Sequence, residues 1–252
     1  MSTALSVNLN KIALLRNSRE GDFPSVLAHG KICLDAGADG LTVHPRPDQR
    51  HIRPSDVYQL AELVAGQEGV EFNIEGNPFA PAKGSYPGLL KLVEDTRPHQ
   101  CTLVPDANDQ LTSDHGFDLT NSTEQLQPII RQLHKFGVRI SLFMDPDPEQ
   151  IRLASALGVE RIELYTGPYA ERFLQGSQQT QDDLERYRLA TEVANQCGLE
   201  VNAGHDLNLQ NLPAFLAIPN IAEVSIGHAL TVDALHMGLV NAVAAYRRIC
   251  QS

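Results

Sequence analysis

The residues best suited to chemistry lie in the stretch GLTVHPRPDQRHI, residues 40–52. An apolar run ends at His44, and Arg46, Arg50 and His51 follow it closely. Guanidinium groups bind phosphate through paired hydrogen bonds, and histidine exchanges protons near neutral pH. This stretch therefore predicts a site that holds a small anion and transfers protons.

Similar side chains recur where other short apolar runs end. The candidates, in chain order, are Asn8, Asn10, Lys11, His44, Arg46, His51, Glu75, Glu163, Asn202, His205, Asp206, Gly227 and His228. For any single histidine, a structural hydrogen-bonding role is the alternative. The repetition of the pattern at independent runs is what favours catalysis.

Three of these groups are candidate acids or bases. His44, Glu75 and His205 follow three different runs, and a carboxyl group sheltered from water can have its pKa raised toward neutrality. The set favours a reaction with several proton transfers on a small carbonyl compound. Glu163 lies inside an apolar run, where it would stabilise positive charge or orient a partner, and a buried ion pair is the alternative.

Two groups of residues are candidate phosphate sites. The first is the set of arginines that follow the first two runs, Arg16, Arg19, Arg46 and Arg50, of which we expect Arg16 or Arg50 to be solvated surface side chains. The second lies in AGHD and SIGHAL, where Gly204 and Gly227 allow backbone N–H groups to approach an anion closely. Two anion sites indicate two phosphorylated substrates or one bisphosphate.

Eight short β-rich runs must position these residues. They are 5–9, 40–44, 71–75, 100–105, 139–144, 161–166, 199–204 and 223–228, with helical periodicity between them. The alternation predicts an α/β fold, a (β/α)8 TIM barrel that spans residues 1–252 as one domain, with polar strand ends meeting at one mouth. A doubly wound open sheet is the alternative, but it usually has fewer strands and a GxGxxG turn, which this chain lacks.

Helix boundaries follow from capping residues. We expect one helix to start with Pro24, Ser55 to be the N-cap of a second, and Asp147 to open a third. We also expect a capping box at Ser122 and Gln125, and one long amphipathic helix over residues 231–250. Two connections, 106–121 and 167–181, are too long for turns and leave the carboxyl ends of strands. Such loops often act as lids, and an insertion carrying an extra helix is the alternative for each of them.

Composition excludes several classes of protein. The formal net charge of -11 is unfavourable for binding nucleic acid or an anionic membrane surface. The four cysteines form no CxxC pair, which indicates reduced thiols in the cytoplasm rather than a zinc site. We find no pattern typical of a secretory signal and no run long enough to span a membrane.

A metal site is the main competitor for the polar residues. Its candidate ligands are His44, His51, Glu75, His205 and Asp206. The chain has no HExxH or HxH spacing, and the nearby arginines would repel a cation. We therefore expect no metal.

Taken together, the motifs resemble one known family. The stretches VNLNKIALLRNSR, GADGLTVHPRPDQRHI, FNIEG, TLVPD, RIELYTG, VNAGHDL and VSIGHAL are similar, in order and over nearly the whole chain, to the pyridoxine 5′-phosphate synthase family. The resemblance implies a TIM barrel with extra helices, assembled as a homo-octamer, that uses no redox cofactor. It also implies ring closure between 3-amino-2-oxopropyl phosphate and 1-deoxy-D-xylulose 5-phosphate, which yields pyridoxine 5′-phosphate, inorganic phosphate and water.

The resemblance further implies a role for each site residue. His44 and Glu75 correspond to the family's general bases, His205 to its proton donor and Glu163 to its transition-state stabiliser. The aminoketone phosphate site corresponds to Asn8, Arg19, Asp206, Gly227 and His228. The deoxyxylulose phosphate site corresponds to Asn10, Lys11, Arg46, His51 and Thr112.

Three positions depart from the family pattern. Asn10 and Lys11 stand where the family often has Asp-His, and Asp206 stands where it often has glycine. Lys11 keeps a cation that can bind an anion, although it would be a poor base. Asp206 would repel a phosphate unless only its backbone N–H were used.

Two other functions remain open from the sequence. One is a metal-dependent aldolase or isomerase that acts on a sugar phosphate. The other is a non-catalytic sensor that binds phosphorylated ligands on the same fold.

Overall fold

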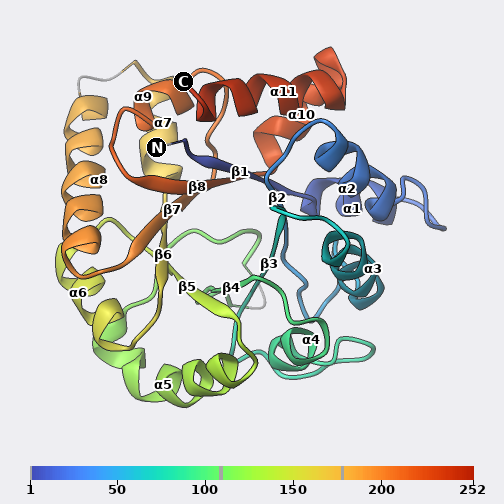
Figure 1. The fold of residues 1–252 in the computed structure, drawn as a ribbon, viewed down its shortest axis with the longest axis horizontal. Helices are drawn as coiled ribbons and strands as arrows, with labels where there is room; N and C mark the ends of the chain where they lie inside the picture. The colour runs from blue at the N-terminus through green and yellow to red at the C-terminus, as the bar shows by residue number, and fades with distance from the viewer. Residues whose placement is uncertain (1, 108–109, 177–178) are drawn as a thin grey trace.

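The computed structural model describes residues 2–107, 110–176 and 179–252. Eight parallel strands form a closed barrel in sequence order (Figure 1). They are β1 (Ala4–Asn8), β2 (Gly40–Val43), β3 (Glu71–Gly76), β4 (Gln100–Leu103), β5 (Arg139–Met144), β6 (Arg161–Tyr165), β7 (Glu200–Gly204) and β8 (Ile221–Ile226). Because β1 pairs with both β2 and β8, the sheet has no free edge, which confirms the predicted barrel and excludes the open sheet.

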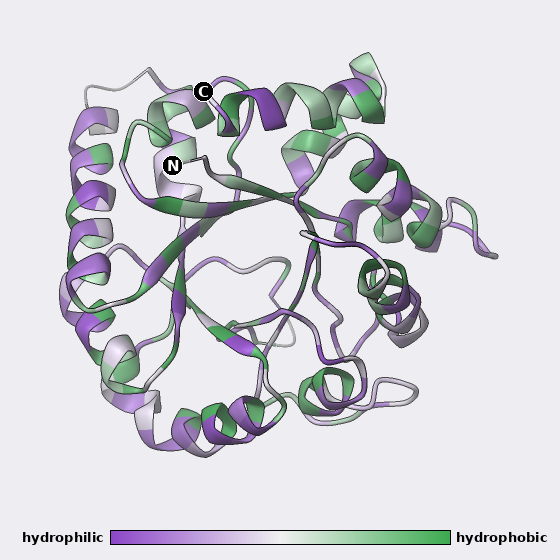
Figure 2. Ribbon diagram, viewed as in Figure 1, coloured by the Kyte–Doolittle hydropathy of each residue, from purple (hydrophilic) through white to green (hydrophobic). Residues whose placement is uncertain are grey.

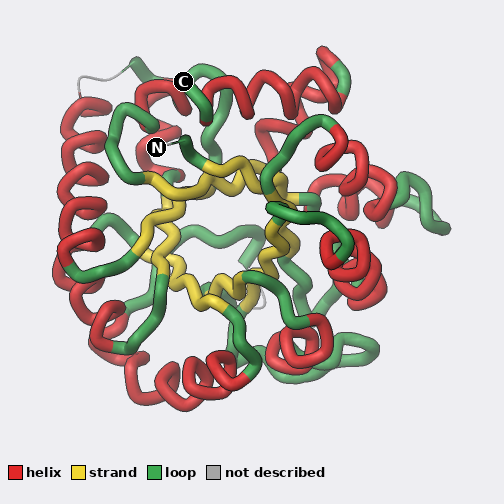
Figure 3. Tube along the Cα trace, viewed as in Figure 1, coloured by secondary structure: helices red, strands yellow, loops and turns green. Residues whose placement is uncertain are grey.

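The helices form a ring outside the strands (Figure 3). They are α1 (Asn10–Asn17), α2 (Val26–Asp35), α3 (Pro54–Ala65), α4 (Leu89–Thr96), α5 (Leu119–Lys135), α6 (Pro148–Ala156), α7 (Gly167–Leu174), α8 (Gln179–Gln196), α9 (Leu212–Phe215), α10 (His228–Met237) and α11 (Leu239–Cys250). Within the described ranges, no helix is long and apolar enough to cross a membrane.

Two predictions are confirmed: an extra helix in the 167–181 connection and a helix start at Asp147. The 167–181 segment contains an extra helix, α7, and residues 177 and 178 lie outside the described part of the chain. The predicted start at Asp147 is correct, because its carboxylate accepts a hydrogen bond from the Glu149 N–H at 2.9 Å.

Two early helices begin at other residues than predicted. Helix α2 begins at Val26 rather than Pro24, because the Ser25 hydroxyl caps the first turn. Helix α3 begins at Pro54, so the predicted cap Ser55 lies inside the helix. Proline suits this first position because it has no N–H to leave unpaired.

Two later predictions are also wrong at their boundaries. Helix α5 begins at Leu119 with Asp118 as its N-cap, so Ser122 and Gln125 lie inside it and form no capping box. The long terminal helix is broken at Gly238, whose φ of 82° is incompatible with a continuous helix.

Polar and apolar residues alternate along the strands (Figure 2). Polar side chains point inward and bond across the barrel: Asn202 on β7 reaches Gln100 on β4 at 3.5 Å, although these strands are not neighbours. An apolar side chain, Phe143, also points inward and lines the mouth. The outward side chains, such as Leu5, Leu41 and Ile74, are completely buried against the helices. Burial of each such side chain stabilises the fold by roughly 2 kcal/mol, which leaves the barrel axis free for polar groups.

Candidate active site

A cavity of about 390 Å³ opens at the carboxyl ends of the strands. Its lining includes these predicted site residues: Asn8, Asn10, Lys11, His44, Arg46, His51, Glu75, Thr112, Glu163, His205, Asp206, Gly227 and His228. The other candidates from the sequence, Arg16, Arg19, Asn202 and Gly204, do not line it. Parallel strands deliver their carboxyl ends to the same rim, so residues far apart in sequence meet here.

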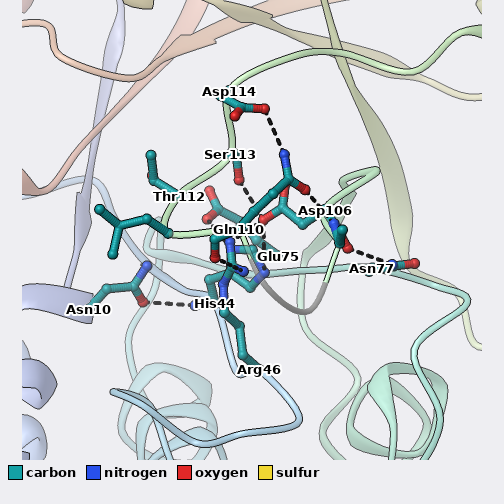
Figure 4. Close-up of polar contacts among 12 residues, drawn as sticks. Asn10, His44, Arg46, Glu75, Asn77, Asp106, Gln110, Thr112, Ser113 and Asp114 are labelled. Carbon is teal, nitrogen blue, oxygen red and sulfur yellow. Dashed lines mark hydrogen bonds and ion pairs between the residues drawn. The ribbon is translucent and has the colours of Figure 1, made fainter.

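The first two strands are joined at this rim by asparagine side chains. The Asn8 carboxamide oxygen accepts from the Asn10 N–H at 2.9 Å. The Asn10 oxygen in turn accepts from the His44 N–H at 2.9 Å (Figure 4). Asn10 therefore positions the backbone of His44. Lys11 lies beside it in the first turn of α1 and lines the cavity.

His44 lies between two buried carboxyl groups. Its Nδ1 is 3.9 Å from Oε2 of Glu75, and its Nε2 is 3.8 Å from Oδ2 of Asp106. Asp106 was missed as a site residue in the sequence, where it marked only the start of a long loop. Its position directly after the buried β4 run TLVP was a signal that could have identified it.

Burial sets the protonation states of His44 and Glu75. Desolvation lowers the pKa of His44 well below its ordinary value, and Arg46, His51 and Arg50 lower it further. Desolvation, followed by the Asp106 and Glu223 charges, raises the pKa of Glu75 to about 8. Near neutral pH, His44 is therefore a neutral acceptor and Glu75 can both give and take a proton.

Glu163 is buried among other carboxyl groups. Desolvation, together with the charges of Glu75 and Glu223, raises its pKa well above the ordinary value. Within the described residues its Oε2 has no hydrogen-bond partner. An added Cβ at Gly204 would collide with Oε1 of Glu163, so glycine is required there for this side chain to fit.

Arg46 bridges the rim and the loop that follows β4. It forms an ion pair with Asp106, and its Nη1 donates to the Gln110 backbone oxygen at 3.1 Å (Figure 4). The Ser113 hydroxyl donates to Asp106 at 2.8 Å, and Arg50 donates to the Gln110 oxygen at 2.7 Å. These contacts hold the described part of the predicted lid, residues 106–121, against the strand ends. Residues 108 and 109 lie outside the described part of the chain.

The same loop reaches the opposite side of the mouth. The Thr112 hydroxyl lies 2.9 Å from Nε2 of His205, and Nδ1 of His205 lies 2.8 Å from Oδ2 of Asp206. The His205 and Tyr165 rings pack in a T-shaped arrangement, with ring centroids 5.2 Å apart. His205 is thus fixed between two hydrogen-bonding partners and an aromatic ring.

The carboxyl ends of β1 and β8 lie close together at the cavity. Gly227 is the N-cap of α10, and an added Cβ there would lie 3.0 Å from the Cβ of Asn8. His228 begins α10 and lines the cavity. The arrangement presents a helix N-terminus to the cavity, where an anion is favoured.

The arginines of the first predicted anion site do not form one cluster. The expectation of a solvated Arg16 is wrong: it is 3% exposed, and its Nη2 donates to Asp56 at 2.9 Å. Burial, which is costly for an unpaired guanidinium, is offset by this pairing. Arg50 is half-buried by its lid contacts, and Arg19 is exposed beyond the end of α1, outside the cavity.

His51 also lines the cavity. Desolvation, then Arg46 and Arg50, lower its pKa to about 3, so the ring is neutral. The chain over its described ranges contains no group of three or more His, Cys, Asp or Glu side chains placed to hold a metal ion.

The chain matches, over residues 5–252, the family described as Pyridoxal phosphate biosynthesis protein PdxJ. The chain belongs to this family. It is 55% identical over 250 residues to the pyridoxine 5′-phosphate synthase of Xanthomonas campestris pv. campestris (strain B100), covering 99% of this chain and 96% of that relative. It is 51% identical over 251 residues to that of Xylella fastidiosa (strain M23), covering 99% and 95%.

Family membership confirms the resemblance inferred from the motifs. The PdxJ chain is an enzyme, a ring-closing synthase of vitamin B6 biosynthesis. The alternatives of a sugar-phosphate aldolase and a non-catalytic sensor find no support in this match.

Solved structures share the fold of this PdxJ chain at low sequence identity. A tryptophan synthase from M. tuberculosis superposes with a TM-score of 0.64 at 13% identity, covering 100% of this chain and 93% of that one. A 4-hydroxy-2-oxoglutarate aldolase superposes with a TM-score of 0.63 at 14% identity, covering 99% and 96%. At such identities the likeness concerns the barrel alone.

Proposed function

We propose that the cavity joins 3-amino-2-oxopropyl phosphate to 1-deoxy-D-xylulose 5-phosphate, forming pyridoxine 5′-phosphate and releasing inorganic phosphate and water. The observation that carries this proposal is the meeting of His44, Glu75 and His205 in one cavity that also contains basic groups. Condensing an amine with a carbonyl compound and closing the ring requires protons to be both removed and donated. Groups from different strands, with different proton affinities, can divide these tasks.

His44 and Glu75 are assigned as the general bases. Neutral His44 has one acceptor nitrogen, and Glu75 becomes a base as its proton is lost near pH 8. Nδ1 of His44 and Oε2 of Glu75 are 3.9 Å apart, longer than a hydrogen bond, so a proton passes between them only after the groups move closer or through one bridging water. Asp106, on the far side of the imidazole, orients the His44 ring.

His205 is assigned as the proton donor. Its Nε2 faces the cavity and the lid hydroxyl of Thr112, so a proton held there points toward bound substrate. Thr112 lies on the predicted lid. Closure of the lid over the substrate would therefore also place the Thr112 hydroxyl against the proton donor His205.

Glu163 is assigned as the stabiliser of positive charge in the transition state. In the ligand-free chain, burial and neighbouring carboxylates favour its protonated form. A cationic reaction species beside it would favour the ionised form, because opposite charges stabilise each other strongly in a buried site. The stabilisation would thus arise only as charge develops.

Two phosphate subsites are assigned to the rim. Asn8, Gly227, His228 and the backbone of Asp206 would hold the aminoketone phosphate at the N-terminus of α10. Asn10, Lys11, Arg46, His51 and Thr112 would hold the deoxyxylulose phosphate. Arg19 keeps its predicted assignment to the first subsite, although in this chain alone it lies outside the cavity.

The wider context is also part of the proposal. Residues 1–252 would act as one barrel domain in the cytoplasm, in a homo-octamer, and would not bind nucleic acid or membranes. The net charge of -11 supports the last point. Exposed apolar side chains, including Leu14, Leu15, Val232 and Leu235, support self-association.

The test is to mix both substrates with the purified chain and follow product absorbance and released phosphate. His205→Asn and Glu75→Gln should each lower kcat by at least about a hundredfold, the scale expected for a lost acid or base. Glu124→Gln, a change of an exposed carboxyl on α5, is the control. Binding of both phosphates without turnover would identify a sensor, and loss of turnover on chelation would indicate a metal-dependent enzyme.

A further inference from the structure

His205 has a hydrogen-bonding partner at each ring nitrogen. Asp206 Oδ2 lies 2.8 Å from Nδ1, and the Thr112 hydroxyl lies 2.9 Å from Nε2. The carboxylate is purely an acceptor when ionised, so this contact requires the proton to be on Nδ1. Nε2, the atom that faces the cavity, is then available to hold and release a second proton.

The backbone at this point adopts a conformation that favours glycine. The φ angles of His205 and Asp206 are 90° and 59°. Thr166 and Asn211 hold the turn from outside: the Thr166 hydroxyl donates to the carbonyl oxygens of Gly204 and His205, and Asn211 Nδ2 donates to that of Asp206 at 3.1 Å. Positive φ is costly for a residue with a side chain and persists where the surroundings impose it.

The Asp206 side chain is therefore not needed to make the turn. A glycine would adopt the same backbone at lower cost, and none of the clamping hydrogen bonds uses the Asp206 carboxylate. The described contact of that carboxylate is with His205. Lys11 and His228, both in the cavity lining, interact with it electrostatically, so the negative charge lies among groups that favour its ionised form.

We propose that Asp206 is a positioning residue for His205, which fixes the imidazole with its proton on Nδ1 and directs Nε2 at the substrate. The proposal rests on the proposed function, in which His205 donates a proton. The donor delivers the proton from Nε2 and takes one back at the same atom, while the Nδ1–H remains bonded to Asp206 throughout. Without the carboxylate the ring is free to rotate or to change tautomer, and only a fraction of molecules present a proton correctly.

The first measurement is the tautomer of His205 in the full-length, ligand-free protein. Solid-state 15N spectra of histidine-labelled protein report which ring nitrogen carries the proton, and a difference spectrum against His205→Asn assigns the signal. At a pH where the ring is neutral, native protein should show the Nδ1–H form. Asp206→Gly should convert most of it to the Nε2–H form. An unchanged tautomer would overturn the proposal.

The second measurement is steady-state turnover. Asp206→Gly should lower kcat about tenfold, with KM for 1-deoxy-D-xylulose 5-phosphate changed less than about twofold, the signature of an interaction that acts in the chemical step. Asp206→Asn retains an oxygen acceptor for Nδ1–H and should recover most of the lost kcat. Equal kcat in native and glycine variants, or no recovery with asparagine, would contradict the proposal.

A matched control separates positioning from backbone strain. Asn220 also has a positive φ, 63°, but it is exposed and lies outside the cavity lining. Asn220→Gly should leave kcat and the His205 tautomer at native values, and neither glycine variant should lower the melting temperature. If His205→Asn itself keeps full turnover, the proposed donor role fails. The tautomer measurement still decides whether Asp206 orients the ring.

Discussion

The Nδ1 atom of His44 lies 3.9 Å from Oε2 of Glu75, with both side chains buried at the mouth of the barrel. The same desolvation acts on the two groups in opposite chemical senses. It lowers the pKa of the imidazole and raises that of the carboxyl to about 8, so both groups are neutral at pH 7. The site therefore holds an acceptor beside a donor, and their roles change as Glu75 loses its proton.

The activity of the free enzyme should rise with pH. If Glu75 acts as a base, its ionised fraction increases about tenfold per pH unit below its pKa of about 8. We expect kcat/KM to increase from about pH 6.5 to about pH 8.5 and then level off. The measurement is a pH profile of kcat/KM, and an activity that is highest below pH 6.5 would remove Glu75 as the base.

Stability should have the opposite pH dependence. Burial raises the pKa of Glu223 to about 7, so its folded form retains a proton that the unfolded chain releases near its ordinary value. This contribution is full below the unfolded value and is lost as pH rises through about 7. The melting temperature of the native chain should therefore fall between pH 5 and pH 8. The melting temperature of Glu223→Gln should fall less over the same range. Glu124→Gln, on the surface, should follow the native curve.

Asp106 should hold the lid closed. Asp106→Asn removes the negative charge that pairs with Arg46 and weakens the bond from Ser113. We expect limited proteolysis between residues 110 and 117 to become severalfold faster. Both substrate analogues together should slow cleavage of the native chain. Asp182→Asn, which changes an exposed carboxyl on α8, is the control. Identical cleavage rates in the two variants would show that Asp106 does not hold the lid closed.

Lys11 should bind substrate rather than transfer protons. It lies in the cavity lining beside the predicted deoxyxylulose phosphate subsite, where its charge can attract the phosphate. Lys11→Ala should raise KM for 1-deoxy-D-xylulose 5-phosphate about tenfold with a much smaller change in kcat. Lys11→His should restore most of the affinity. Unaltered kinetics would identify a solvated lysine, and a collapse of kcat would place Lys11 in the chemistry.

Much of the fold follows from local patterns in the sequence. Eight β-rich runs alternate with helical segments, and parallel strands joined in this way place their carboxyl ends on one rim. For this reason His44, Glu75 and His205 could be identified as neighbours without coordinates. Helix boundaries do not follow in the same way, because the hydrogen bonds that define a cap, such as that of Asp118, depend on local geometry.

Other properties of the site were decided only by the tertiary structure. The sequence places Arg16 and Asp56 40 residues apart, and only the tertiary structure shows that the Arg16 side chain on α1 reaches Asp56 on α3. Likewise, Asp106 becomes part of the site because the strands bring it to His44. The direction of each pKa shift depends on desolvation and on charges contributed by other strands, and neither exists until the barrel closes. The sequence by itself determined which chemical groups reach the rim, since strand periodicity is local. Their protonation and pairing arise from contacts between distant segments.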